Sequence, residues 1–330
     1  LLDDDTTQLF FLANSVILNT IVSGLGTVSN VISILIFVRQ GFRDTVNISL
    51  FGLAFSDLLS LVSLLWLAIL SNPLLKNSEQ ILFVALDVQY LTAGWPHVCF
   101  ARVTGWITAF VTFERCLCIC LPLKVKTILT PTRVNGCIVG IFLVVMASVA
   151  PTYYTSRLGD VFIAERNRTL VGLVVTPDRA QVESVAFTIN NVVSPIGSFC
   201  VVVVCTIVLA VKLREKTKWR QSATRAKEQD RAGKISRKDQ KAVKMVVAIS
   251  TVFIVSFTPT TVFFAWMAHD PAFGAGGVYQ NIFNVVFSFS FLLEAINGSV
   301  NIFVYYNMSS RYRNSFIRMF RFGSGSAVGK

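Results

Sequence analysis

The acidic and basic pair Glu114–Arg115 follows a long apolar segment, and charges in that setting need a physical reason. The segment runs from Tyr90 to Val111 and contains one charged residue, Arg102. Charges at membrane depth are costly, so those found there commonly serve ion pairing or function. The simpler alternative is a juxtamembrane pair that holds a helix end at the lipid headgroups.

Two carboxyl groups lie in equally apolar surroundings, Asp57 and Glu294. Such a group must be protonated, paired with a cation or bound to a metal ion, because its burial alone costs several kcal/mol. Arg102 is the basic residue at a depth comparable with that of Glu294, whereas His97 lies more than one helical turn further out. We therefore expect either an Arg102–Glu294 ion pair or a direct contact of these charges with a ligand.

The composition is that of a membrane protein. Of the 330 residues, 53% are hydrophobic and 15% are charged, whereas about 25% are charged in soluble domains. Seven charge-poor stretches could each cross ~30 Å of hydrocarbon as a helix of ~20 residues. The sequence thus predicts an all-α seven-helix membrane bundle, not a β-barrel of short alternating strands. The stretches are Thr6–Val38, Leu58–Leu75, Tyr90–Val111, Val134–Ser156, Ser184–Val211, Met245–His269 and Pro271–Ser310.

The charges are distributed unequally over the two sides of these spans. If the chain begins outside, 24 of the 30 Lys and Arg lie inside and five lie outside, and the remaining one is Arg102. The positive-inside rule therefore predicts an extracellular N-terminus. The net charge of +12 is explained by topology and contact with anionic lipids, so nucleic-acid binding is not expected.

The first three spans contain short motifs of a recognisable type. Glu114–Cys116, with Pro122–Leu123 seven residues after the arginine, resembles the Asp/Glu-Arg-Tyr motif and the second inner loop of rhodopsin-like (class A) G-protein-coupled receptors. Leu53–Asp57 resembles the second helix, and Asn30 matches the asparagine of the first. The small residues beside Asn30 predict close helix packing with an interhelical hydrogen bond.

The later spans extend the resemblance. Ser194–Pro195 matches the proline of the fifth helix, Phe253–Pro259 resembles Phe-x-x-x-Cys-Trp-x-Pro, and Asn297–Tyr305 resembles Asn-Ser-x-x-Asn-Pro-x-x-Tyr. Pro259 is expected to kink the sixth helix and to make it a lever. Departures from the family in these later spans include Val203 in place of a tyrosine, Phe257 in place of a tryptophan and Ile302 in place of a proline.

The resemblance also implies a function. Glu114–Leu117 with Pro122–Lys126, and Val300–Arg313, look most like invertebrate neuropeptide receptors of the FMRFamide type and their molluscan chemosensory relatives. It implies a plasma-membrane receptor, not an enzyme, that binds an extracellular ligand, most often a neuropeptide, and activates a heterotrimeric G protein. The alternatives are a chemosensory receptor for a small molecule, a non-signalling scavenging receptor and a transporter. A retinal protein would need a lysine in the last span, which has none.

The resemblance implies an allosteric sodium ion and no other cofactor. In the family the aspartate of the second helix binds sodium together with polar residues of the third and seventh helices. The matching residues here are Asp57, Thr104, Asn297 and Asn301. The alternative is a neutral, hydrogen-bonded Asp57 with no ion.

Helical spacing and the resemblance together predict a ligand-binding face on the third, sixth and seventh spans. Its mixture of charges and aromatic rings suits a peptide or another zwitterionic ligand. His97 stands where amine receptors carry an aspartate, so a monoamine is not expected. The predicted ligand-binding residues are His97, Ala101, Arg102, Phe257, Thr260, Thr261, Phe264, Phe287, Phe291 and Glu294.

A second set of residues is expected to couple the bundle to the G protein. Asp239 lies where many relatives carry an acid that pairs with the arginine of the third helix, and the alternative is an ordinary solvated charge. The predicted coupling and switch residues are Glu114, Arg115, Asp239, Pro195, Phe253, Pro259 and Tyr305.

The segments outside the spans complete the predicted organisation. We expect a mobile extracellular stub at 1–11, the membrane domain at 12–308, an amphipathic helix at 309–322 and a cytoplasmic tail at 323–330. The family's outer disulfide is absent, because Tyr90 replaces one cysteine and the loop from Thr155 to Val182 contains none. That loop is therefore expected to be unpinned, and its sequon at Asn167 is a predicted glycosylation site.

Overall fold

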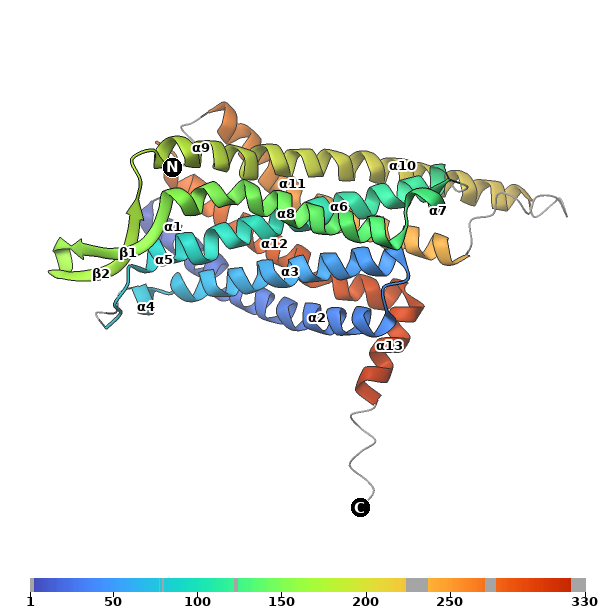
Figure 1. Cartoon of the computed structure of the whole chain (residues 1–330), viewed down its shortest axis with the longest axis horizontal. Coiled ribbons are helices and arrows are strands. Elements are labelled where there is room, and N and C mark those ends of the chain that lie inside the picture. The colour runs from blue at the N-terminus through green and yellow to red at the C-terminus, as the bar shows by residue number, and fades with distance from the viewer. Residues whose placement is uncertain are drawn as a thin grey trace, which may run out of the picture.

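The computed structural model describes residues 3–76, 78, 80–121, 124–223, 237–270 and 277–321. Long helices run side by side along the molecule, with a β-hairpin at one end and the helix α13 at the other (Figure 1). In the described part, seven helices are long and apolar enough to cross a membrane. The prediction of an all-α bundle with seven spans is confirmed.

Several spans consist of more than one helical segment. The first contains α1 (Asp4–Phe11), the π-helical η1 (Leu12–Leu18) and α2 (Asn19–Gln40), and the second is α3 (Thr45–Leu70). The third contains α5 (Ala85–Gln89), η2 (Tyr90–Gly94) and α6 (Trp95–Cys120), and the fourth is α8 (Pro131–Thr155).

The fifth contains α9 (Arg179–Phe187), η4 (Thr188–Val193) and α10 (Ser194–Ala223). The sixth is α11 (Arg237–His269) and the seventh is α12 (Gln280–Met308). The short helices α4 (Pro73–Lys76) and α7 (Val125–Ile128) lie between spans, and α13 (Ser310–Arg321) follows the last.

The second span begins earlier than its charge-poor stretch suggests. It starts at Thr45 and ends at Leu70, instead of running from Leu58 to Leu75. The Asp44 side chain caps it by accepting a hydrogen bond from the Val46 amide at 3.2 Å. Asp57 therefore lies in the middle of a membrane helix, where it needs partners from the bundle.

The N-terminal residues also differ from expectation. Residues 4–11, predicted to be a mobile stub, form α1, which continues into the first span. The ring of Phe10 packs 6.1 Å from that of Phe289, and Asn281 Nδ2 donates to Asp4 Oδ1 at 2.8 Å. These contacts fix α1 to α12, so the start of the chain belongs to the bundle.

Close packing of α2 against α12 agrees with the small residues in the first span. Asn30 Nδ2 donates to the Gly298 carbonyl oxygen at 2.8 Å. A Cβ added to Gly26 would collide with the Ser299 side chain. Glycine at this position therefore allows the two backbones to approach and the amide to bridge them.

A β-hairpin forms the loop between α8 and α9. Its strands, β1 (Ser156–Ile163) and β2 (Arg168–Val175), are antiparallel, and Ser156 lies opposite Val175. The turn η3 (Ala164–Arg166) joins them, and the following Asn167 is exposed with a φ of +46°. The predicted glycosylation site thus lies at the tip of the hairpin.

The hairpin is fixed to the start of the third span without a disulfide. The Val171 amide donates to the Leu82 carbonyl at 2.9 Å, and the Val84 amide donates to the Val171 carbonyl at 2.8 Å. Asp87 Oδ2 accepts a third hydrogen bond, from the Leu173 amide, at 2.9 Å. The expectation of an unpinned loop is therefore wrong, because backbone pairing and one carboxylate hold it.

The amphipathic helix predicted at 309–322 is present as α13, and the tail from 323 lies outside the described residues. Its Tyr312 is 1% exposed, and the hydroxyl lies 2.8 Å from Ser33 Oγ of α2. Burial raises the pKa of Tyr312 to about 12, so the phenol keeps its proton and can donate to Ser33. This contact fixes α13 to the first span.

We expect Asp87→Leu to loosen the hairpin, because a hydrogen bond to a charged acceptor contributes ~1.5–3 kcal/mol. Hydrogen–deuterium exchange at the Leu173 amide should become about tenfold faster or more. Asp160→Leu, at an exposed position of the same hairpin, is the control and should leave this exchange unchanged. Dithiothreitol should also change nothing, because all seven cysteines are free. Equal exchange in both variants, or sensitivity to the reductant, would contradict this account.

Candidate functional site

Glu294 is at the centre of a buried charge cluster between α6 and α12. Its Oε2 lies 2.8 Å from His97 Nε2, and its Oε1 accepts a hydrogen bond from Arg102 Nη2 at 3.2 Å. His97 is 0% exposed, Arg102 4% and Glu294 7%. Both carboxylate oxygens are therefore bound inside the protein, each by a different nitrogen group of α6.

The Arg102–Glu294 pair, one of the two alternatives that the sequence left open, is present, and His97, which lies more than one turn further out, reaches the same carboxylate. Depth along α6 did not identify both partners of Glu294, because its carboxylate has two oxygens. One oxygen contacts His97 and the other contacts Arg102, five residues further along α6. The other ring nitrogen, His97 Nδ1, lies 3.0 Å from Ser60 Oγ of α3. Ser60 could have been found from its spacing, since it follows Asp57 by three residues and shares its helix face.

Asp57 is held by neutral donors. Thr104 Oγ1 donates to Asp57 Oδ1, and Asn301 Nδ2 donates to Asp57 Oδ2, both at 2.8 Å. None of the ion pairs among the described residues includes Asp57. The carboxylate therefore still requires a proton or a cation to balance its charge.

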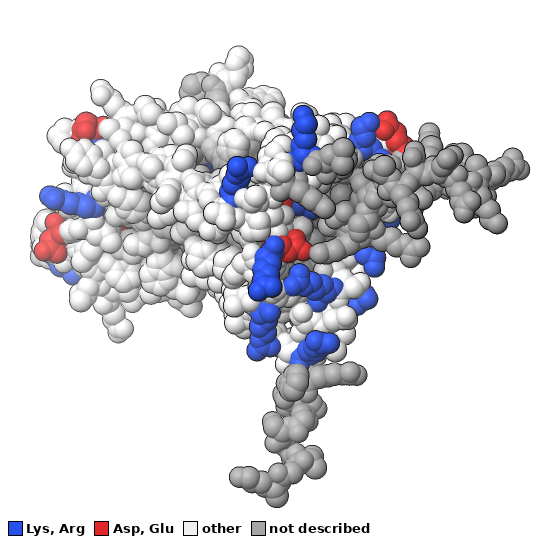
Figure 2. Space-filling view, turned by 45° about the vertical axis from the view of Figure 1, so that its right-hand side comes forward, with Lys and Arg blue, Asp and Glu red and all other residues white. Residues whose placement is uncertain are grey.

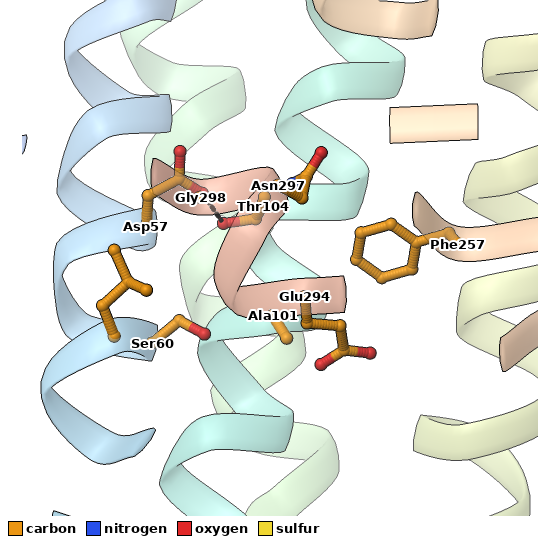
Figure 3. Close-up of a pocket in the computed structure, with 9 residues that line it drawn as sticks. Asp57, Ser60, Ala101, Thr104, Phe257, Glu294, Asn297 and Gly298 are labelled. Atoms are coloured by element: carbon orange, nitrogen blue, oxygen red, sulfur yellow. Dashed lines mark hydrogen bonds between the residues drawn. The ribbon is translucent and has the colours of Figure 1, made fainter. Parts of the chain in front are cut away.

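A small cavity lies between Asp57 and Glu294 (Figure 3). Its volume is ≈ 10 Å³, about the room that one water molecule or a small ion occupies. The buried oxygen of Asn301, Oδ1, has no hydrogen-bond partner among the described residues. Carboxylate, hydroxyl and amide oxygens suit hard cations, so this donor set fits sodium. The cavity is lined by Asp57, Ser60, Leu61, Ala101, Thr104, Phe257, Glu294, Asn297 and Gly298.

Aromatic rings form a column from the charge cluster toward the hairpin end of the bundle. The ring of Phe291 lies 4.9 Å from His97 and 4.6 Å from Phe287. Phe264 continues the column at 6.0 Å from Phe287, and Phe187 of α9 lies a further 6.4 Å away. The sequence predicted the first three phenylalanines and missed Phe187, which comes from a different span.

Two predicted ligand-binding residues of α11 have buried hydroxyls with no hydrogen-bond partner in the described part of the chain. Neither Thr260 Oγ1 nor Thr261 Oγ1 has a hydrogen-bond partner among the residues that the structure describes, and the same is true of Arg102 Nε. Buried polar groups are normally paired. These three groups therefore are candidates to contact the polar part of a ligand.

At the α13 end, Arg115 is 4% exposed and pairs with Glu114. Glu114 also accepts a hydrogen bond from Ser49 Oγ of α3 at 3.1 Å. One turn along α6, Thr112 Oγ1 lies 2.8 Å from Ser250 Oγ of α11. These contacts close α6 against its neighbours, so the described conformation is closed around Arg115.

The remaining predicted switch residues lie along α10, α11 and α12. Phe253 stacks on Phe257 with their ring centroids 4.4 Å apart, six residues before Pro259 in the same helix. Tyr305 packs between Phe37 and Tyr312, at 5.4 and 5.5 Å, and its hydroxyl has no hydrogen-bond partner in the described part of the chain.

Of the last two predicted switch residues, the structure describes Pro195 but not the side chain of Asp239. Pro195 is the second residue of α10, directly after the π-helical η4, and it has no amide hydrogen to donate to that segment. The Asp239 side chain lies outside the described residues, so its pairing with Arg115 stays a prediction.

The α13 end of the bundle is hollow and rich in basic side chains. Figure 2 shows Lys and Arg gathered at this end, around α13 and the adjoining helix ends. A cavity of ≈ 570 Å³ opens there between α2, α3, α11 and the junction of α12 with α13. Among its lining residues are Asn47, Lys241, Met245, Met308 and Arg311.

Comparison with known proteins assigns the family. Residues 29–305 match the family described as 7 transmembrane receptor (rhodopsin family). This chain belongs to that family. The receptor is also similar to the FMRFamide receptor of Drosophila melanogaster, with 22% identity over 312 residues, which are 92% of this chain and 53% of the relative. The chain thus spans about half the length of that relative.

Family membership confirms the predicted class. The protein is a multi-pass membrane receptor of the rhodopsin family, and receptors of this family are not enzymes. An extracellular ligand and a G protein are the partners that the family implies.

We expect the charge cluster to behave as one unit in a double-mutant cycle. Glu294→Gln or Arg102→Gln leaves a charge buried without its partner, which costs ~3–5 kcal/mol. The double variant should be destabilised by less than the sum of the two, as measured by thermal unfolding of the purified receptor. Arg179→Gln, which breaks the more exposed Arg179–Glu183 pair, is the control and should cost at most ~1 kcal/mol. Additive losses at Glu294 and Arg102 would exclude the pair.

Proposed function

We propose that this receptor binds an extracellular neuropeptide and activates a heterotrimeric G protein. The similarity to an FMRFamide receptor over 92% of the chain is the observation that carries the choice of ligand class. The proposal places the receptor in the plasma membrane with α1 and the hairpin outside. The basic α13 end then faces the cytoplasm, as the positive-inside rule favours.

The peptide would enter from the hairpin end and contact the aromatic column. Phe264, Phe287 and Phe291 offer apolar and ring-stacking contacts to aromatic side chains of a peptide. Below them, both oxygens of Glu294 are already bound within the protein. A basic group of the ligand would have to displace Arg102 or His97 to reach that carboxylate.

The unpaired polar groups support a different polar contact. Arg102 Nε is a donor, and the hydroxyls of Thr260 and Thr261 can donate or accept. A peptide carbonyl, a terminal amide or a carboxylate would satisfy them. We therefore expect the ligand to present a hydrogen-bond acceptor at the level of Arg102, beneath an aromatic or aliphatic side chain.

Signalling would proceed by opening the α13 end. A ligand that binds an open bundle better than the closed one shifts the receptor toward the open form. In the closed form Arg115 is covered and Thr112 joins α6 to α11. Movement of the segment of α11 before Pro259 would break this contact and present Arg115 and the ends of α6, α10, α11 and α12 to the G protein.

We expect Arg115→Ala to abolish G-protein activation per receptor at the cell surface while leaving ligand binding largely intact. Cells expressing the receptor would first be screened with libraries of amidated and free peptides and of small molecules, and nucleotide exchange on co-expressed G proteins would be measured. Arg39→Ala, which removes an exposed arginine at the same end, is the matched control and should signal normally. Undiminished signalling by Arg115→Ala would refute the coupling role. A receptor that internalises ligand but activates no G protein would favour the scavenging alternative.

We also propose that sodium binds beside Asp57, with Thr104, Asn297 and Asn301 supplying the other oxygens. A ligand that binds only the folded state raises stability, by about 1.4 kcal/mol at ten times its dissociation constant. Sodium chloride should therefore raise the unfolding temperature relative to choline chloride at the same ionic strength. The gain should vanish in Asp57→Asn and persist in Asp44→Asn, which alters a carboxylate outside the bundle core. An equal gain in all three proteins would remove the ion from this site.

A further inference from the structure

We propose that the cavity at the α13 end binds a long-chain carboxylic acid and that its occupation holds the bundle closed. This cavity of ≈ 570 Å³ is separate from the ligand-binding face and from the sodium site, since it shares no lining residue with either. The proposal rests on the proposed function only for its effect on signalling, because binding of the acid can be measured without a G protein.

The lining of the cavity changes from polar to apolar along α11. Lys241 is exposed, whereas Met245, one helical turn further into the bundle on the same face, is 4% exposed. The other walls contribute the buried side chains of Phe37 from α2 and Leu50 from α3. A ligand can therefore keep a charged group at the level of Lys241 and bury an apolar chain against Met245, whose flexible side chain adapts to different shapes.

The charges at the polar end favour an anion. The charged lining residues are the cations Lys241 and Arg311 and the acid Asp44. Arg311 Nη1 lies 3.8 Å from Asp44 Oδ2, and none of the ion pairs among the described residues includes Lys241. The helix α13 also begins at this wall, with Ser310, and the amide hydrogens of a first helical turn carry partial positive charge. One acidic group would balance the remaining cation.

The volume of the cavity favours a ligand with one chain. At ~30 Å³ per non-hydrogen atom, the volume of one molecule in liquid water, ≈ 570 Å³ holds about 19 such atoms, about as many as a carboxylic acid of 16 carbons contains. A membrane phospholipid has two chains of this kind and a larger head group, so it does not fit. The shape, the charge and the volume together point to a free fatty acid.

Hydrogen bonds hold three walls of the cavity together. Asn47 Nδ2 donates to the carbonyl oxygens of Phe37 and Gly41 at 2.9 and 2.6 Å, which joins α3 to the end of α2. Arg311 Nη2 donates to the Gln40 carbonyl oxygen at 2.7 Å, which joins α13 to α2. Because these walls are pre-formed, little ordering is required when a ligand binds. The remaining wall, α11, is the helix that moves in the proposed function.

Occupation of the cavity is coupled to the conformation through α11. Lys241 and Met245 belong to the segment of α11 before Pro259, whose movement opens the bundle in the proposed function. A fatty acid that contacts both residues and the Arg311 wall joins α11 to α13 only while the two are close. The acid therefore favours the closed form, and by reciprocity a bound G protein lowers the affinity for the acid.

Photo-cross-linking of the purified full chain in phosphatidylcholine nanodiscs tests the site directly. The probe is palmitic acid with a diazirine in its chain, and mass spectrometry should locate it on peptides that contain Met245 or Met308. Lys241→Gln should weaken labelling about tenfold or more, because a contact between charged groups is lost. Lys244→Gln removes an exposed lysine of α11 that does not line the cavity, and this control should be labelled like the wild type. Ala242→Phe, which fills the cavity without changing its charge, should abolish labelling.

Competition with unlabelled compounds tests the chemistry of the ligand and its source. Palmitate should displace the probe, whereas hexadecanol, which has the same chain without the acid, should not. Phosphatidylserine added to the nanodiscs should not displace it either, because an acidic head group on two chains does not fit the cavity. Equal displacement by hexadecanol, displacement by phosphatidylserine, or equal labelling of Lys241→Gln and the wild type would overturn the proposal.

The second measurement is nucleotide exchange on purified G proteins in the presence of the extracellular ligand. Palmitate should reduce exchange by the wild type and by Lys244→Gln, and it should have little effect on Lys241→Gln and Ala242→Phe. An increase in exchange, or the same reduction in all four proteins, would overturn the assignment of the acid to the closed form. Failure of every G protein to respond would instead overturn the proposed function, and the cross-linking would then decide the fatty-acid site alone.

Discussion

The structure depends on the absence of water from the membrane interior. Every polar group in a spanning helix must find its partner within the protein, since hydrocarbon offers none. The lipid-facing surface accordingly carries exposed side chains such as Leu143, Val144 and Val255, whereas the carboxyl groups at membrane depth face inward. Asp57 lies on α3, Glu114 on α6 and Glu294 on α12.

The bundle neutralises these acids in different ways, and the difference determines what each can do. Glu294 has the cation Arg102 and the ring nitrogen of His97 as partners, so both of its carboxylate oxygens are bound within the protein. Asp57 has only neutral donors among the described residues, so its charge needs a mobile partner. Glu114 pairs with the adjacent Arg115, which is 4% exposed, and in the proposed function this pair is the switch.

Where this chain lacks residues of the family pattern, other contacts occupy their places in the structure. Phe257, which replaces a tryptophan, stacks on Phe253 and lines the cavity next to Glu294. No cysteine fixes the outer loop, and backbone hydrogen bonds of Val171 with a carboxylate contact from Asp87 do so instead. Such contacts form with any side chain at Val171, which is why the lack of cysteines wrongly suggested a free loop.

The sequence by itself determined the seven spans, the family resemblance and the inward position of the acids, because span length, hydropathy and local spacing are properties of contiguous residues. Depth along the helices also gave the Arg102–Glu294 pair as one of two alternatives. Only the tertiary structure decided that His97 shares the carboxylate, that Ser60 and Ser49 complete the acid sites, and that Thr112 meets Ser250. These contacts join residues 37 to 197 positions apart, and they depend on the rotation of each helix about its axis and on its distance from its neighbours. The hydropathy of a single span does not contain that information.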